Sequence, residues 1–257
     1  MHIVVLVKAV PIVGTERLGP DHRTQRNQLE ANGNDEYTLE KALKLTEAHG
    51  GEVSLLSMGP ASALDALRKA LAMGATRAYQ VQDDALAGSC IRGTVDVLVA
   101  ALKKIEFDLL FVGADTSDGL GGVVAPAVAA RLGMPYLSYA SEIEPVDGGG
   151  VRVHRLSATG YDVLEAATPA VVMGTQVLGE PRYPSLRGIM QARSKETTTW
   201  SLADLDIDPA SVGEAGATTR FLSSEAPPQR SGAQVVKGSA DETATAIVDF
   251  LTARRLI

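Results

Sequence analysis

The chain has 257 residues, of which 45% are hydrophobic and 21% charged, so it is long enough to bury a core in one large domain, with or without an appendage. Its 24 Lys and Arg residues against 31 Asp and Glu residues give a net charge of −7. No long basic run is present of the kind that binds a phosphate backbone, and we expect no nucleic-acid partner.

Cysteine content and the first residues indicate the compartment. Cys90 is the single cysteine, so no internal disulfide forms and a reducing compartment is expected. We interpret Cys90 as an ordinary helix residue. The apolar run of residues 3–7 is too short for a signal peptide or a membrane span. The sequence thus predicts a cytoplasmic protein without membrane insertion.

Short apolar runs alternate with helical patterns in the first half of the chain, which is typical of a parallel sheet covered by helices. The runs that predict buried strands are residues 3–7, 53–58, 78–81 and 109–112. Helical spacing of apolar residues predicts helices over residues 36–48, 61–73, 91–105 and 123–132. We expect an α/β fold, with an open, mostly parallel, Rossmann-like sheet and helices on both faces.

The pattern changes after residue 136. Four runs separated by turn residues predict consecutive strands with antiparallel pairing, over residues 136–143, 151–156, 161–166 and 170–173. Residues 203–237 are poor in large apolar side chains, so we expect an extended C-terminal arm. The arm leads into a helix with Ser239 and Glu242 at capping-box spacing and an apolar face made by Ala244, Ile247, Val248 and Leu251.

A glycine-rich loop follows the fourth predicted strand. Gly113, Gly119, Gly121 and Gly122 let the backbone approach a ligand, and the free N–H groups of a helix that begins near Val123 favour an anion. Ligands of open α/β sheets bind beyond the carboxyl ends of the strands, where this loop lies. A nucleotide phosphate is the expected ligand, and the missing P-loop lysine favours a monophosphate. The alternative is a βα turn without a ligand.

Further loops reach the same edge of the sheet. Asn32 and Asn34 precede a predicted helix and are placed to hydrogen-bond a ribose or a base. The alternative is a local role of Asn34 and Asp35 in a helix cap and an Asx-turn. Lys8, after the first strand, has the same two interpretations. We therefore expect residues 1–202 to form a nucleotide-binding α/β domain and residues 203–257 to form the arm and terminal helix.

No pattern of catalytic residues is found. The four histidines are scattered without the spacing of metal ligands. The motifs of hydrolase nucleophiles and of zinc proteases are absent. We expect a binding protein without catalytic residues and without a metal site.

One stretch resembles a known family. Residues 169–193 read PAVVMGTQVLGEPRYPSLRGIMQAR, which closely resembles the signature of electron-transfer flavoprotein β subunits. Supporting matches are the opening IVVLVKAVP, residues 59–79, the loop TSDGLGG and the C-terminal arm. The resemblance covers essentially the whole chain.

The resemblance implies a heterodimer in which the larger α subunit mainly holds one FAD. This chain would bind AMP structurally, help to enclose the flavin and catalyse no bond-making step. Electrons would come from flavin dehydrogenases such as acyl-CoA dehydrogenase, in fatty acid oxidation, and pass toward a quinone-linked oxidoreductase. By position, the implied AMP contacts are Leu6, Asn32, Gly33, Asn34, Asp35, Met58, Gly113, Ser117, Asp118, Gly119, Leu120, Gly121, Gly122 and Val123.

The chain departs from the family pattern at two places. Many relatives have Thr-Gly-Gln where this sequence has residues 121–123, Gly-Gly-Val, so phosphate contacts are expected from loop amides. Near the flavin, mitochondrial-type relatives place aromatic residues at the positions of Val13 and Asn34. This subunit is therefore expected to add no stacking contact.

The resemblance also implies contacts with partners. Residues 184–193 correspond to a recognition loop in which Leu186 plugs an apolar pocket of the dehydrogenase, whereas the alternative is a core leucine on a short helix with Ile189 and Met190. Asp162 and the terminal helix are expected at the interface with the α subunit. Two other functions stay open: an electron-bifurcating member with a second FAD in the AMP pocket, and a stand-alone ATP-binding protein of the universal stress type.

Overall fold

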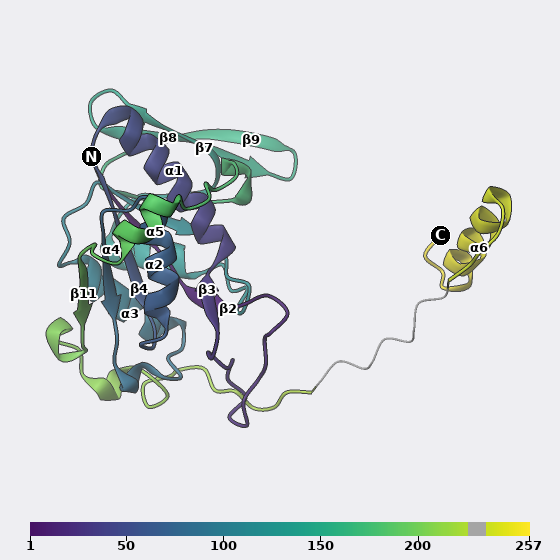
Figure 1. The fold of residues 1–257 in the computed structure, drawn as a ribbon, viewed down its shortest axis with the longest axis horizontal. Helices are drawn as coiled ribbons and strands as arrows, with labels where there is room; N and C mark the ends of the chain where they lie inside the picture. The colour runs from purple at the N-terminus through teal and green to yellow at the C-terminus, as the bar shows by residue number, and fades with distance from the viewer. Residues whose placement is uncertain (226–234) are drawn as a thin grey trace. The chain divides into compact units, whose positions relative to one another are not determined.

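Nine strands form one sheet with helices on both of its faces (Figure 1). The computed structural model describes residues 1–225 and 235–257. The strand order is β11-β5-β4-β1-β6-β10-β7-β8-β9. The strands are β1 (His2–Leu6), β4 (Glu52–Met58), β5 (Arg77–Val81), β6 (Leu109–Gly113), β7 (Tyr136–Val146), β8 (Gly150–Ser157), β9 (Gly160–Ala167), β10 (Ala170–Gly174) and β11 (Thr197–Trp200). The predicted α/β fold is confirmed.

Smaller elements complete the chain. β2 (Ala9–Pro11) and β3 (Leu29–Ala31) pair antiparallel as a separate two-stranded sheet. The helices are α1 (Gly33–His49), α2 (Ala63–Met73), α3 (Ile91–Leu102), α4 (Val124–Leu132), α5 (Leu186–Ala192) and α6 (Ala240–Ala253). Single 3₁₀ turns are η1 (Asp84–Leu86), η2 (Gln176–Leu178), η3 (Ala203–Leu205) and η4 (Pro209–Ser211). The short strands β2, β3 and β11 were not predicted.

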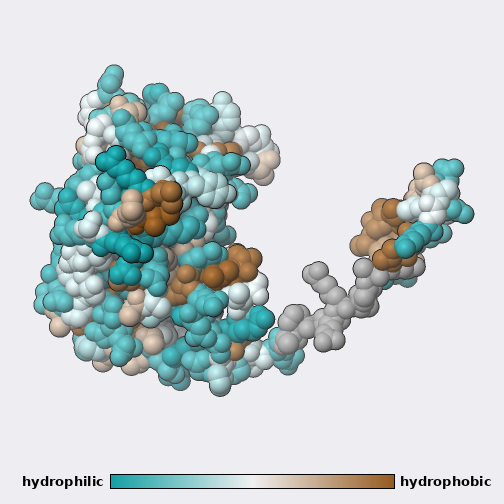
Figure 2. Space-filling model, in the orientation of Figure 1, coloured by the Kyte–Doolittle hydropathy of each residue, from teal (hydrophilic) through white to brown (hydrophobic). Residues whose placement is uncertain are grey.

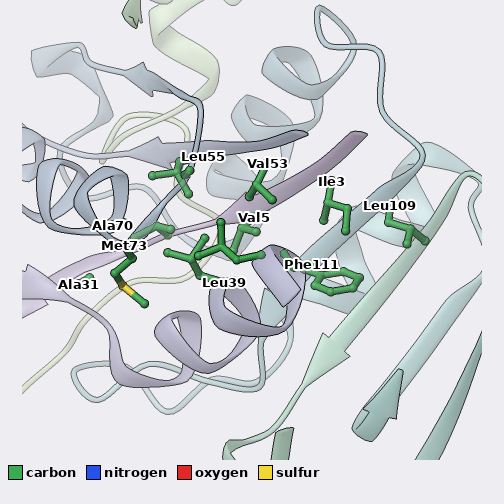
Figure 3. Packing of buried hydrophobic residues seen from close by; sticks show 14 of the residues in the cluster. Ile3, Val5, Ala31, Leu39, Val53, Leu55, Ala70, Met73, Leu109 and Phe111 are labelled. Carbon is green, nitrogen blue, oxygen red and sulfur yellow. The ribbon is translucent and has the colours of Figure 1, made fainter. Parts of the chain in front are cut away.

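Two apolar clusters hold the helices against the sheet, because successive residues of a strand point to opposite faces. Ile3 and Val5 of β1 lie in a cluster with residues of α1 and α2, whereas Val4 lies in a second cluster with residues of α3 and α4. Figure 3 shows the side chains of Val5, Leu39 and Phe111 in the first cluster. Burying each such side chain contributes about 1.5–3 kcal/mol.

The prediction of antiparallel strands after residue 136 is right for β7, β8 and β9 and wrong for β10. β10 pairs in parallel with both β6 and β7. All five residues of β10 are buried, as expected for a parallel strand with both faces covered. The continuous apolar run of β10, without alternating polar residues, is the sequence pattern that indicates a parallel strand buried on both faces.

The described residues divide into two compact units, Met1–Phe221 and Leu222–Ile257. Leu205 and Val212 are buried in the cluster beside α3 and α4, so residues 203–221, expected in the arm, belong to the first unit. Residues 226–234 of the predicted arm lie outside the described residues. Nowhere in the described parts of the chain does a helix combine the length and apolarity needed to cross a membrane.

The second unit contains α6 with the predicted cap. Ser239 accepts a hydrogen bond from the Glu242 amide, and Glu242 accepts one from the Ser239 amide, so the capping box is present. Ile247 and Val248, on the predicted apolar face, are exposed. The helix therefore displays apolar side chains on its surface.

Candidate functional site

The carboxyl ends of three central strands lie at one edge of the sheet, and the first turn of α1 reaches the ends of β1 and β6. Leu6, Met58 and Gly113 are the last residues of β1, β4 and β6. β1 lies between the other two strands and pairs in parallel with both. The residues predicted for a nucleotide site from these strands are thus at one edge, where α/β sheets bind ligands.

Gly113 allows α1 to approach the end of β6. A Cβ atom on Gly113 would lie 2.4 Å from Asp35 Oδ1 and 2.9 Å from the carbonyl carbon of Asn34. Asp35 also accepts a hydrogen bond of 2.8 Å from the Lys8 amide. A single buried carboxyl therefore joins the first turn of α1 to the ends of β1 and β6, and this contact requires glycine at position 113.

The environment of Asp35 shifts its ionisation. Burial raises the pKa of Asp35 from 3.8 to about 7, against hydrogen bonds from Lys8, Asn32 and Gly113 that lower the pKa. Because the pKa in the folded chain exceeds the ordinary value, the contribution of Asp35 to stability is fully present below pH 3.8 and declines as the pH rises to about 7.

Asn32 and Asn34 tether the glycine-rich loop. The Asn32 side-chain amide donates to the carbonyl oxygen of Asp115 at 2.8 Å, and Asn32 Oδ1 accepts from the Ser117 amide at 3.2 Å. Asn34 Nδ2 donates to Asp115 Oδ1 at 2.5 Å. Asn32 occupies the N-cap position of α1 without a side-chain cap bond, and Asn34 and Asp35 lie inside the helix. The alternative role as a local cap is therefore wrong, and both amides fix the loop.

Asp118 fixes the loop from the other side. Its carboxylate lies 2.7 Å from Lys8 Nζ and 2.8 Å from Arg26 Nη2, and Lys8 Nζ also donates to Thr116 Oγ1 at 3.2 Å. Burial opposes ionisation, but Lys8, Thr116 and Arg26 outweigh it and hold the pKa of Asp118 below its usual value. Arg26 was not predicted, because residues 12–28 carry no periodic pattern that places them at this edge.

The tip of the loop presents backbone to the surroundings. Leu120 and Gly122 have φ values of +46° and +60°, and a Cβ atom on Gly121 would meet no atom of the described chain within 4 Å. Val123 is the N-cap of α4 and makes no side-chain cap bond. Successive amides before an uncapped helix start form a nest for an anion, which is what a nucleotide phosphate requires.

A second surface is formed by α5 on the side of α2. Leu186 begins the helix and is 82% exposed. Tyr183, Ile189 and Met190 are also exposed, and Figure 2 shows an apolar patch over α5. The alternative that Leu186 is a core residue is therefore wrong.

The segment that carries this patch is anchored by charged side chains. Arg182 binds Glu40 with Nε at 2.7 Å from Oε2 and Glu47 with Nη1 at 2.5 Å from Oε1, both on α1. Lys195 Nζ donates to the carbonyl oxygens of Leu71 and Ala75 at 2.9 and 2.6 Å, at the end of α2. These anchors were not predicted, because no local pattern pairs residues so far apart in sequence.

The other candidate residues are separate from the loop. Asp162 lies on the outer strand β9 and forms an ion pair of 2.6 Å with Arg155. Cys90 was expected inside a helix, but it is the N-cap of α3 and precedes the first helical residue. Within the described ranges, no group of three or more His, Cys, Asp or Glu side chains is arranged to hold a metal ion.

The sequence is similar to members of one protein family. Residues 23–205 match the family model described as electron transfer flavoprotein domain. The electron transfer flavoprotein subunit beta of Thermoanaerobacterium thermosaccharolyticum is 34% identical, with 100% of each chain covered. The protein of the same name from Megasphaera elsdenii is 37% identical over 97% of this chain and 96% of its own. The caffeyl-CoA reductase-Etf complex subunit CarD of Acetobacterium woodii is 33% identical over 100% of both.

Proposed function

The chain belongs to the electron transfer flavoprotein family as a β subunit, and from this premise we propose that it binds AMP in a heterodimer whose α subunit mainly holds one FAD. Its role is electron transfer, and an α subunit is its partner. In the proposal, flavin dehydrogenases of the acyl-CoA dehydrogenase type supply the electrons, which pass toward a quinone-linked oxidoreductase. The chain itself catalyses no bond-making step. Its single cysteine supports a cytoplasmic location.

The loop of residues 113–123 carries the proposal for AMP. Asn32 and Asp118 hold the two ends of its first half, and its second half presents amides at the start of α4. A phosphate monoester offers oxygen acceptors to such amides without needing a lysine. Leu6 and Met58 would contact the nucleotide from the strand ends beside the loop.

In the proposal, this chain helps to enclose the flavin but places no aromatic side chain against the flavin ring. FAD supplies the one-electron chemistry, and the protein's part is to position the flavin and exclude water. Val13, in the position of the aromatic residue of mitochondrial-type relatives, is exposed and would contact the flavin side of the α subunit. Asp162 and α6 are proposed to contact the α subunit as well.

The exposed Leu186 is proposed to anchor the dehydrogenase. Burying one leucine contributes roughly 2 kcal/mol, so Leu186→Ala is expected to lower kcat/KM for electron acceptance from an acyl-CoA dehydrogenase by about tenfold to thirtyfold. FAD and AMP contents should not change, because Leu186 lies on α5, which packs against α2. The rate is measured by flavin reduction at subsaturating concentrations of both proteins.

Ile91→Ala is the matched control. Ile91 begins α3, on the other face of the sheet, and is 48% exposed, so its truncation removes a similar apolar side chain elsewhere. Its kcat/KM should equal that of the unchanged protein. Equal rates for Leu186→Ala and Ile91→Ala would refute the anchor.

Two alternatives are separated by experiment. A universal stress-type protein would stay monomeric and hold ATP when co-expressed with an α subunit, whereas the proposed function predicts a heterodimer in gel filtration. An electron-bifurcating member would hold a second FAD in the AMP pocket. Counting the flavins per heterodimer, one or two, decides this second alternative.

A further inference from the structure

Both cations beside the glycine-rich loop are held by one buried carboxylate. The two oxygens of Asp118 lie 2.7 Å from Lys8 Nζ and 2.8 Å from Arg26 Nη2. The Asp118 side chain is 3% exposed, whereas the side chains of Lys8 and Arg26 are 38% and 31% exposed. Asp118 therefore cancels one of the two positive charges at a place where water screens the pairs only partly.

This cluster touches the backbone that would receive a phosphate. Asp118 directly precedes Gly119, where an added Cβ atom would lie 3.2 Å from Thr116 Oγ1 and 3.6 Å from Lys8 Nζ. The amides of Gly119 and Leu120 donate to the Thr116 carbonyl oxygen at 3.2 and 2.8 Å, so an anion would bind the amides from Gly121 to Val123, which follow the cluster within five residues of Asp118. Each further phosphate group adds negative charge, and P-loops meet that charge with a lysine that reaches the β- and γ-phosphates.

We propose that Asp118 is a specificity-determining residue of the nucleotide site. By holding Lys8 and Arg26, it restricts the loop to ligands with the charge of a nucleoside monophosphate and disfavours ADP and ATP. This inference rests on the proposed AMP-binding function and deepens it, because it names the group that selects among adenine nucleotides.

The test is a competition in the heterodimer. The complex, freed of its nucleotide, is incubated with equimolar AMP and ATP, and the nucleotides retained after gel filtration are counted by chromatography. The unchanged protein should retain AMP over ATP by at least about tenfold. Asp118→Asn keeps the shape of the side chain, removes its charge and leaves both cations available, so the AMP to ATP ratio should fall by about tenfold.

Two further variants guard the interpretation. Asp147→Asn makes the same change of charge at an exposed position in the turn between β7 and β8 and should leave the ratio unchanged. Arg26→Gln removes one cation while Asp118 keeps its charge, so the ratio should rise severalfold. Arg26→Gln decides the case should Asp118→Asn fail to assemble with the α subunit.

The outcomes separate this inference from the function on which it rests. The role of Asp118 alone would be overturned if the unchanged protein retains AMP over ATP and Asp118→Asn gives the same ratio. Where Asp118→Asn does not assemble, the same ratio in Arg26→Gln would overturn it. Failure of the unchanged heterodimer to retain any adenine nucleotide would overturn both. Opposite shifts in the two variants would establish the selection by charge.

Discussion

Gly113→Ala is expected to lower the free energy of unfolding of the chain by about 3 kcal/mol and to deprive the heterodimer of AMP. The new Cβ atom would lie 2.4 Å from Asp35 Oδ1 and 2.9 Å from the carbonyl carbon of Asn34. The Asn34 carbonyl carbon is backbone and the Asp35 carboxyl is held by the Lys8 amide, so the first turn of α1 must move away from β6. Asn32 and Asn34 move with it, and the loop that they tether loses its shape.

Gly121→Ala is the control for the stability effect alone, because Gly121 itself belongs to the proposed phosphate site. A Cβ atom at position 121 would meet nothing within 4 Å in the described chain, so the free energy of unfolding should change by less than about 0.5 kcal/mol. Urea unfolding of both variants, with chromatography of the bound nucleotide, measures the two effects. An unchanged stability and a full AMP content in Gly113→Ala would show that the contact between α1 and β6 is not required.

Arg182→Met is expected to destabilise the chain by about 3 kcal/mol. The variant leaves Glu40 without its main partner. The Glu40 side chain is only 4% exposed, and its ion pair with Lys44, at 3.4 Å, remains. Because Arg182 also binds Glu47, the segment that leads into α5 loses its attachment to α1. Electron acceptance from the dehydrogenase should therefore fall as it does in Leu186→Ala.

Two comparisons test this explanation of Arg182→Met. Replacing both partners, in Glu40→Leu with Arg182→Met, should recover most of the stability, because no buried charge is left unpaired. Arg152→Met, which breaks an exposed pair of similar geometry with Glu165, should cost less than about 1 kcal/mol. A cost of Arg182→Met as small as that of Arg152→Met would contradict the account.

The pH dependence of the same variant has a defined sign. Burial opposes ionisation of Glu40, but hydrogen bonds and charge from Arg182 hold the pKa of Glu40 below its ordinary value of 4.5. A depressed pKa in the folded state contributes stability that is present above pH 4.5 and is lost as the pH falls further. The difference in stability between the unchanged chain and Arg182→Met should therefore shrink as the pH falls below 4.5.

The central strands and helices could be predicted because burial of an element produces a local pattern of apolar residues in the sequence. β1, β4, β5 and β6 are short apolar runs, and α1 to α4 repeat apolar residues at helical spacing. β10 has the same continuous apolar pattern, but the order of strands in a sheet depends on contacts between residues far apart in the chain. That is why β10 was placed with the antiparallel strands and β11 was missed.

The candidate site was predicted in part for the same reason. Glycines and loop positions mark the edge of a sheet locally, so Gly113 and Asn32 were found. The partners of Asp118 come from positions 8 and 26, and the partners of Arg182 come from positions 40 and 47. Only the folded chain brings such charges together, and a single sequence carries no signal for these pairings.

The central claim is that loop amides around Gly121 bind the phosphate of AMP while the α subunit holds the flavin. Its most direct test is to purify the heterodimer, release its cofactors by denaturation and count them by chromatography. The account predicts one FAD and one AMP per heterodimer, with the AMP lost in Gly113→Ala. Two FAD molecules and no AMP, or one FAD and no adenine nucleotide at all, would contradict it.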